Sequence, residues 1–342
     1  MKKVLPILLF HFMICSLSFA GDNNKAFSFL NLPFNPHTAA LGGTNITLSG
    51  NNISNAFNNP ALLAYDESNQ LSLNYMNYVS DINMGSAIYG RSVGLRGMWS
   101  AGILFMNYGK FTETTPENIV LGTFSANDLA FMGTYSYELT DRLRAGITGK
   151  LIYSGYERYT SWGIGVDLGL NYFRPEKGLS ASITLKNLGG QIKSYHDSNE
   201  KMPWDIQLGI SKKMEHAPFR FSLTAYHLNR WDMSIYREKE NNSIIGEEDE
   251  APKKDNFFLT LAKHLVFGID FVPTENFYLS VGFNPQAQSE FSITGKKGIY
   301  GFSFGTGIQV KRFQIEASYF QRNPKGGTFM LGVTTSFDSY NF

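Results

Sequence analysis

The sequence predicts an all-β fold, namely a transmembrane outer-membrane β-barrel of about 14 antiparallel strands with an N-terminal hatch or plug segment. Three observations predict it. Segments with a two-residue hydrophobic period recur along the chain, many with the roughly 9–11 residues that a tilted transmembrane strand needs. Short and long connections alternate between these segments, and the chain is rich in aromatic residues (15%) and glycine (33 residues). We expect a signal peptide at 1–20, the hatch at 21–68 and the barrel at 69–342.

The first twenty residues have the order of a secretory signal peptide. Lys2 and Lys3 precede an apolar run, and Ser18-Phe19-Ala20 resembles a cleavage site. The apolar run is shorter than the ~20 residues that a spanning helix needs, which argues against a retained anchor. Cleavage near Ala20 removes Cys15, the only cysteine, so we expect no disulfide and no cysteine-based metal site in the mature chain.

The composition excludes some classes of protein. The formal net charge of +1 argues against a nucleic-acid-binding protein, which usually carries an excess of basic residues. After residue 20 no apolar run approaches the length of a transmembrane helix, whereas aromatic and glycine enrichment suits a membrane barrel with aromatic girdles.

One segment, YTSWGIGVDLGLNYF at 159–173, shows the two faces of a barrel strand. Bulky residues alternate with small and polar ones, and we expect the bulky face to contact lipid. Trp162 and Tyr172 then lie near the two membrane–water interfaces. The opposite face, which carries Gly163, Gly165, Asp167 and Gly169, should line the lumen. Since glycine in a strand commonly marks the close approach of another backbone, these glycines indicate that something fills the lumen.

Strand candidates cover the whole mature chain. They are 70–79, 82–90, 94–108, 127–139, 143–157, 159–173, 179–188, 204–212, 219–228, 264–272, 277–283, 299–311, 313–321 and 327–337. Strands of a soluble sandwich average nearer ~5–6 residues. If the first strand runs outward, the even-numbered connections (140–142, 174–178, 213–218, 273–276 and 311–312) are short periplasmic turns. Most odd-numbered ones (109–126, 189–203, 229–263 and 284–298) are long outer loops, as in outer-membrane barrels.

The chain ends in a strand that suits barrel assembly. Residues 327–337 alternate, and the terminal Phe342 resembles the aromatic signal that the outer-membrane assembly machinery recognises.

The segment 26–64 is the candidate hatch, because it is too apolar for a free tail and a barrel of about 14 strands is too wide for side chains alone to fill. Asn35 and Pro36 predict the cap and first residue of a short helix that Gly42-Gly43 ends. Ser54 is a candidate cap for a second helix, interrupted at Asn59-Pro60. The alternative is a folded extension outside the barrel. The proposed structural motif of the hatch comprises Leu32, Pro33, Leu41, Gly42, Gly43, Asn58, Asn59 and Pro60.

Charged residues at inward positions could line a channel or pair with one another and with the hatch. They are Lys150, Asp167, Arg220 and Glu316. If Tyr156 and Tyr159 close the 143–173 hairpin, Lys150 and Asp167 become diagonal neighbours, which favours pairing.

No grouping of residues predicts catalysis. The mature histidines are His37, His196, His216, His227 and His264, with no pair at metal-ligand spacing, and no G-x-S-x-G motif occurs. We therefore predict no catalytic, metal or cofactor site and no enzyme activity; bound lipid or detergent is compatible with such a barrel. The hydrophilic run 237–255 is predicted to be a solvated outer loop, and 257–263 to be either a short helix or a strand extension.

Two segments carry a family resemblance. FLNLPFNPHTAALGGTNI together with NAFNNPALLA resembles the N-terminal region of the PorV/PorQ family of Bacteroidota outer-membrane proteins, relatives of the FadL-type fourteen-stranded transporters with a hatch. HLVFGIDFVPTENFYLSVGFN (264–284) resembles a second family block. Length and motif spacing are closer to PorQ than to PorV, although NPHTAA departs from the Ser-Ala-Arg-like start expected there.

The resemblance implies a component of the type IX secretion system in the outer membrane of a Gram-negative, Bacteroidota-type bacterium. Such a barrel would anchor the surface attachment complex, binding a PorZ-like partner through outer loops, with PorU and PorV in a wider complex that attaches cargo to lipopolysaccharide. The partner-binding residues are not identifiable from sequence. The alternative is a FadL-like transporter of hydrophobic compounds, which requires a path beside the hatch such as a kink or gap in a wall strand.

Overall fold

The structure is a computed structural model that describes residues 25–337 except 49, 51, 118, 196–198, 232–255, 292–298 and 324–325. The predicted signal peptide, the hydrophilic run 237–255 and the terminal Phe342 lie outside the described residues.

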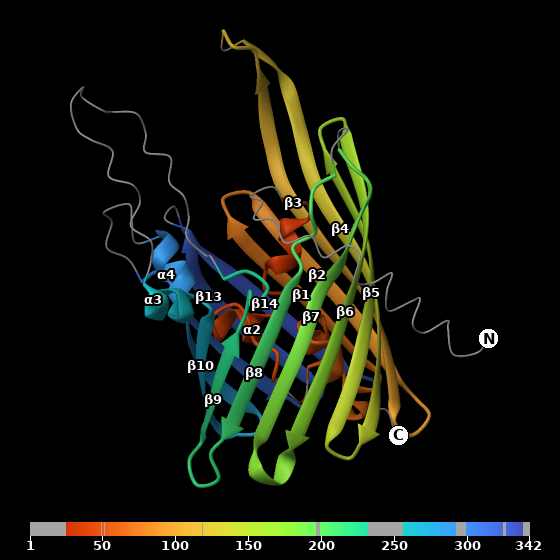
Figure 1. Cartoon of the computed structure of the whole chain (residues 1–342), viewed down its shortest axis with the longest axis vertical. Coiled ribbons are helices and arrows are strands. Elements are labelled where there is room, and N and C mark those ends of the chain that lie inside the picture. Colours follow the sequence, from red (N-terminus) through yellow and green to blue (C-terminus); the bar gives the residue numbers. More distant parts are fainter. Residues whose placement is uncertain are drawn as a thin grey trace.

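The described chain forms a closed barrel of antiparallel strands in sequence order, in which β1 pairs with β14 (Figure 1). The strands are β1 (Gln70–Val79), β2 (Ile82–Val93), β3 (Gly97–Thr114), β4 (Val120–Thr140), β5 (Leu143–Tyr156), β6 (Tyr159–Arg174), β7 (Leu179–Lys193), β8 (Asp205–Lys213), β9 (Phe219–Ala225), β10 (Leu265–Thr274), β11 (Phe277–Phe283), β12 (Phe302–Val310), β13 (Phe313–Asn323) and β14 (Gly326–Ser336). The predicted fold class, an antiparallel barrel of 14 strands, is confirmed.

The two faces of the strands are as predicted. In β6, Trp162 and Tyr172 are on the outside with 40% and 37% of their surface exposed, whereas Asp167 is buried inside. Trp162 packs edge-on against Tyr153 of the neighbouring β5, with ring centroids 5.0 Å apart. Large apolar side chains are exposed in the same alternating way around the barrel, which provides the apolar outer band of a membrane barrel.

The connections also follow the predicted alternation. Short turns, such as 141–142, 275–276 and 311–312, join strands at one end, which we call the periplasmic end. The opposite, outer end carries the long connections 194–204, 226–264 and 284–301. Two connections at the outer end, 80–81 and 157–158, are short as well.

The prediction of an outer loop at 109–126 was wrong. Strands β3 and β4 continue through most of this segment as a two-stranded ribbon that projects beyond the barrel (Figure 1). Phe111 lies directly opposite Phe124, and their rings stack with centroids 5.3 Å apart. Thr112 lies opposite Thr123. Cross-strand aromatic and threonine pairs stabilise a β-ladder. The two strands therefore continue through this segment although most of its residues are polar.

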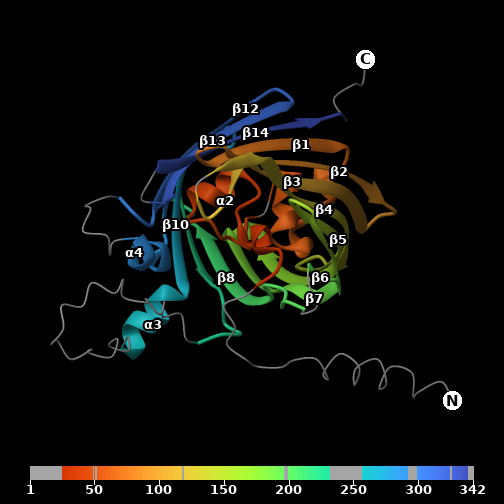
Figure 2. The same ribbon diagram turned by 90° about the horizontal axis from the view of Figure 1, so that it is seen from above.

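Two short helices lie outside the ring of strands, near the outer end of β10. They are α3 (Phe257–Lys263) and α4 (Pro285–Phe291), seen beside the barrel in Figure 2. The Asn256 side chain caps α3 by accepting a hydrogen bond from the Leu259 N–H, so 257–263 is a helix and not a strand extension. Among the described residues, no helix has the length and apolar character that crossing a membrane requires.

The N-terminal segment lies inside the barrel and not beside it (Figure 2). Its helical turns are η1 (Ser28–Asn31), α2 (Pro36–Ala40), η2 (Ile53–Phe57), η3 (Pro60–Leu62) and η4 (Tyr65–Glu67). Helix α2 contacts β11 to β14, η3 contacts β4 to β6, and η2 contacts β1 and β2. We call residues 25–68 the hatch.

Asparagine side chains start the turns of the hatch. The Asn35 side chain accepts a hydrogen bond from the Thr38 N–H and Pro36 is the first residue of α2, as predicted. The helix ends before Gly42 and Gly43, which have φ of 92° and 87°. The cap of the second turn is Asn52 and not the predicted Ser54: the Asn52 carboxamide oxygen accepts from the Ser54 N–H and hydroxyl.

One hatch carboxyl should make stability depend on pH. Burial, with a smaller contribution from the nearby Asp66, raises the pKa of Glu67 to about 8, while Arg144 and backbone N–H groups oppose the shift. The folded chain therefore binds this proton more tightly than the unfolded chain, in which the pKa of the Glu67 carboxyl is 4.5. This contribution to stability is complete below pH 4.5 and is lost as the pH rises through about 8.

We expect Glu67→Gln to raise the thermal unfolding temperature of the purified barrel at pH 9 but to change it little at pH 4.5. Glu117→Gln, in the exposed outer ribbon, is the control and should change neither value. An equal effect of Glu67→Gln at both pH values would contradict this account of Glu67.

Candidate functional site: the lumen around the hatch

The inward glycines leave room for the hatch and for one outer connection. A Cβ atom on Gly163 would lie 2.5 Å from the Phe27 ring, and one on Gly169 would collide with Asn59 and lie 3.0 Å from Pro60 Cδ. A Cβ on Gly165 would lie 3.0 Å from Met202 Cε, in the connection 194–204. The lumen-facing glycines predicted from sequence therefore lie where other chain segments approach β6.

This close approach gives a paired prediction. Gly169→Val should displace the hatch, because the new side chain overlaps Asn59, and overpacking of this kind costs about 1–3 kcal/mol. Limited proteolysis of the folded barrel should then cut within residues 25–68. Gly149→Val places the same side chain where no atom lies within 4 Å, and it should leave the hatch protected. Equal proteolysis of the two variants would show that β6 does not hold the hatch.

The residues of the proposed hatch motif hold the hatch to itself and to the wall. The Gly42 N–H donates to the Ser303 hydroxyl (2.9 Å), Asn58 donates to Thr38 (2.7 Å), and the Asn59 amide donates to the Ile46 carbonyl (3.0 Å). Pro33, Leu41, Gly43 and Pro60 are buried, and Leu32 is half-buried at the edge of the hatch.

A polar cluster links the hatch to β9 and β10. His37 Nε2 of α2 lies 2.9 Å from Asp270 Oδ1, and the other oxygen of Asp270 lies 2.7 Å from the Arg220 guanidinium. The His37 ring stacks on Tyr278, with centroids 3.9 Å apart and planes inclined by 13°. His37, in the segment NPHTAA, thus joins the hatch to a buried carboxylate of the wall.

Glu316 of β13 completes this cluster. Its carboxylate accepts hydrogen bonds from the Tyr278 hydroxyl (2.6 Å), Gln314 (2.9 Å) and the hatch residue Asn52 (2.7 Å). Arg220 and Glu316 are thus engaged with wall and hatch groups and do not line an open channel, as the pairing hypothesis predicts.

The predicted pair of Lys150 and Asp167 is present. Tyr156 is opposite Tyr159, and the Lys150 ammonium lies 2.7 Å from the Asp167 carboxylate, with both side chains buried. Lys150 also donates to the Asn187 side chain at 2.7 Å. Asn187 has φ of 56°, and its backbone N–H donates to Asp167 at a shift in the β6–β7 register. The wall strand β7 is therefore irregular beside the hatch, but polar side chains fill the irregularity.

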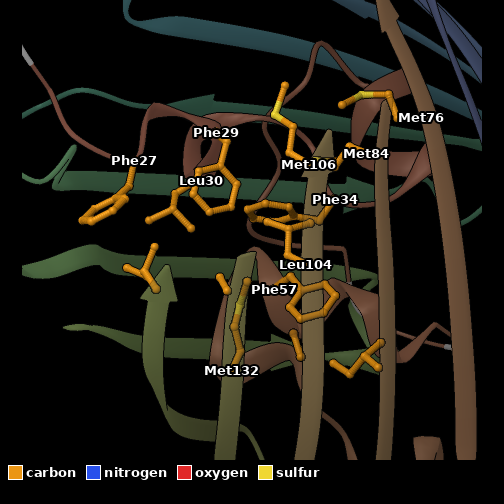
Figure 3. Packing of buried hydrophobic residues seen from close by; sticks show 14 of the residues in the cluster. Phe27, Phe29, Leu30, Phe34, Phe57, Met76, Met84, Leu104, Met106 and Met132 are labelled. Carbon is orange, nitrogen blue, oxygen red and sulfur yellow. The ribbon is translucent and has the colours of Figure 1, made fainter. Parts of the chain in front are cut away.

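The other side of the lumen is apolar and rich in methionine. Phe29, Phe34 and Phe57 of the hatch pack there against inward side chains of β1 to β5, β13 and β14 (Figure 3). The wall side chains of this methionine-rich cluster are Met76, Met84, Ile88, Met98, Leu104, Met106, Ala130, Met132, Ile152, Phe320 and Met330. Sequence reasoning did not identify this cluster, although its methionines alternate with outward residues along predicted strands.

The outer end of this cluster is only partly covered. Tyr78, Ile82 and Tyr108 are partly buried and pack against it. Nearby Asp128 is buried and accepts hydrogen bonds from Tyr108 (2.6 Å) and Tyr156 (3.2 Å). Packed apolar side chains thus extend without interruption from the outer end of the barrel to the phenylalanines of the hatch.

Two cavities border the hatch on its polar side. One, of about 60 Å³, lies between the hatch and the outer ends of β7 and β8, and Lys186 and Asp205 are among its lining residues. The other, of about 170 Å³, lies beside His37, Arg220 and the periplasmic turn at Glu275. Within the described ranges, no group of three or more His, Cys, Asp or Glu residues is arranged to hold a metal ion.

Comparisons with known proteins identify the fold. No family model and no curated protein matches the sequence. The structure is similar to the CymD monoaromatic hydrocarbon channel (TM-score 0.55, 13% identity, 91% of this chain and 99% of that chain). It is also similar to the Pseudomonas putida toluene transporter TodX (0.51, 12%, 89% and 97%) and to a Pseudomonas aeruginosa FadL homologue (0.51, 11%, 89% and 98%).

At these identities the likeness establishes a shared fold alone, that of the FadL-type outer-membrane barrels. None of these findings supports the PorV/PorQ resemblance, which stays a prediction from sequence.

Proposed function

We propose that this protein transports small hydrophobic compounds across the outer membrane. The observation that carries the proposal is the methionine-rich cluster, a continuous set of packed apolar side chains inside the barrel from its outer end to the hatch. The lumen of a water-filled porin is polar, and an apolar lumen wall favours apolar solutes instead. Methionine side chains are flexible and polarizable, so they adapt to ligands of different shapes.

The similar structures support the same proposal. One of them is described as a monoaromatic hydrocarbon channel and another as a toluene transporter. On this basis we prefer transport, the alternative from sequence, to the anchoring role that the PorV/PorQ resemblance implies. We infer monoaromatic hydrocarbons as the first compounds to test. The proposal assigns no catalytic chemistry to the protein.

In this proposal a compound enters between Tyr78, Ile82 and Tyr108 and moves along the methionines toward Phe34. The hatch fills the lumen below, so passage to the periplasm requires part of the hatch to move. The apolar side is the favourable place for this movement, because the His37–Asp270–Glu316 cluster holds the opposite side of the hatch by charged contacts.

A second candidate function is surface anchoring, which one observation favours. The β3–β4 ribbon projects from the outer end and exposes Ile119 and Val120 at its tip, with 61% and 63% of their surface accessible. Exposed apolar side chains on an unpaired ribbon suit a protein partner. We propose that this partner, if the anchoring role holds, is a PorZ-like surface protein in a wider complex with PorU and PorV beside lipopolysaccharide.

One deletion experiment separates the two candidates. In a strain that lacks this gene we expect slower uptake of toluene, with surface proteins retained on the cell. Restoring the gene should restore uptake, whether or not residues 110–124 of the ribbon are replaced by a short turn. Release of surface proteins with unchanged toluene uptake would overturn the transport proposal and favour anchoring.

A further inference from the structure

The cavity at the outer face of the hatch, between the hatch and strands β7 and β8, has an unusual polar lining. Its volume is about 60 Å³. Since one water position takes roughly 10–15 Å³, the cavity has room for about four to six non-hydrogen atoms. Its rim includes Asn31, which is exposed, and Leu32, which is half-buried, so the cavity is reached from the outer side.

Two opposite charges face this cavity without pairing. Lys186 of β7 and Asp205 of β8 are directly opposite in the ladder, and 8% and 2% of their surface is exposed. Such neighbours are expected to form an ion pair. Instead the Lys186 ammonium lies 5.5 Å from the centroid of the Phe34 ring, and no ion pair joins it to Asp205.

The lining also holds unused hydrogen-bonding groups. Asp205 accepts from Gln207 (2.7 Å) through Oδ2, which also lies 3.4 Å from His227 Nδ1. Asp205 Oδ1 and Gln207 Oε1 accept no hydrogen bond within the described part of the chain. Gln207 is 6% exposed, so both acceptors are buried. Buried polar groups are normally satisfied by protein, water or a ligand, and here the residues that carry a cation and two unused acceptors line one small cavity.

We infer that this cavity binds a compact zwitterionic group, with its anionic oxygen facing Lys186 and its N–H donors facing the Asp205 carboxylate and the Gln207 side chain. A simple anion would meet the Asp205 carboxylate, and a simple cation would meet the Lys186 ammonium. A zwitterion satisfies both sides and the unused acceptors together. Two sources carry this chemistry: a free amino acid, or the ammonioethyl end of a single-chain lipid head group with one phosphate oxygen, the rest of the lipid passing Leu32 outside the cavity.

Equilibrium binding to the purified full chain in nanodiscs tests the inference independently of transport. The zwitterionic probes are glycine and lysophosphatidylethanolamine. Acetate and methylammonium carry the two charges of glycine separately, and lysophosphatidylcholine lacks N–H donors. We expect saturable binding of at least one zwitterionic probe, about tenfold tighter than its controls. Binding of glycine alone identifies the free source, and binding of the lysolipid alone identifies the head-group source.

Two variants locate the site. Lys186→Met and Asp205→Asn should each weaken the binding by about tenfold or more, while Lys213→Met, at the exposed periplasmic end of β8, should leave it unchanged. Heat-dependent gel mobility verifies that each barrel is folded. Asp205→Asn keeps the shape of the side chain and remains informative if Lys186→Met does not fold. If no zwitterionic probe binds saturably at about 10 mM, or if neither Lys186→Met nor Asp205→Asn weakens binding, the cavity holds water only and the inference is overturned.

Discussion

Met106→Lys should reduce toluene uptake by about tenfold or more while leaving the barrel folded. Met106 is 3% exposed and faces inward from β3 into the methionine-rich cluster, near its outer end. A lysine ammonium placed there must be hydrated, since burying an unpaired charge among apolar side chains is very unfavourable. Water and charge in the apolar path then raise the barrier for an apolar solute. The measurement is the initial rate of uptake by cells that contain equal amounts of folded barrel.

The matched control is Met214→Lys. Met214 is 44% exposed in the periplasmic turn between β8 and β9, so the same chemical change meets water there. We expect wild-type uptake from this variant. Equal uptake by Met106→Lys and the wild-type protein would mean that the substrate does not follow the methionine-rich cluster.

Asp270→Ala should loosen the hatch and make the barrel conduct ions. Asp270 is fully buried and joins His37 of the hatch to Arg220 of the wall. Removing one partner of a buried charged group leaves the others unpaired, at a typical cost of about 3–5 kcal/mol. We expect a large fall in the unfolding temperature and frequent open events in planar bilayers, where the wild-type protein stays closed.

An exposed ion pair provides the comparison. Glu176→Ala removes a partner that lies 3.2 Å from Arg142 at the periplasmic end, with about half of each side chain accessible. Such pairs contribute about 0–1 kcal/mol, so stability and conductance should stay near wild type. If Asp270→Ala were as closed and as stable as Glu176→Ala, the His37–Asp270 contact would not be what holds the hatch.

The barrel itself could be predicted from the sequence because its signals are local. The two-residue period assigns an inner and an outer side to each strand, as in 159–173, and short turns fix which residues are opposite. That register alone brings Lys150 to Asp167, the pair that the structure contains.

Other features could not be predicted from the sequence. Some depend on contacts between segments far apart in the chain, and others on a choice between two neighbouring residues that could both play the same role. His37 meets Asp270 across 233 positions of sequence. Asn52 and Ser54 both have capping side chains, and the geometry of the turn makes Asn52 the cap. Cross-strand pairs such as Phe111–Phe124 stabilise the β3–β4 ribbon. These pairs lie in a mostly polar segment, whose composition does not indicate a strand. The Lys186 ammonium lies over the ring of Phe34, a hatch residue far from it in sequence.

The two sides of the lumen distinguish the two candidate functions. Motif resemblance favoured an anchoring barrel, whose outer loops would do the work and whose lumen would be inert. The lumen instead has a polar side that holds the hatch and a methionine-rich side that extends to the outer mouth. An inert plug does not require this asymmetry, whereas a path for apolar compounds does.

Under the proposed function, hydrophobic compounds should occupy the methionine-rich cluster inside the barrel. The most direct measurement is anomalous X-ray scattering from crystals of the full chain exposed to iodobenzene, an aromatic compound that carries a strong scatterer. The account predicts iodine sites inside the barrel, in contact with Met84, Met106 or Phe34, and their loss in Met106→Lys. Iodine sites confined to the lipid-facing surface, with none inside the barrel, would contradict it.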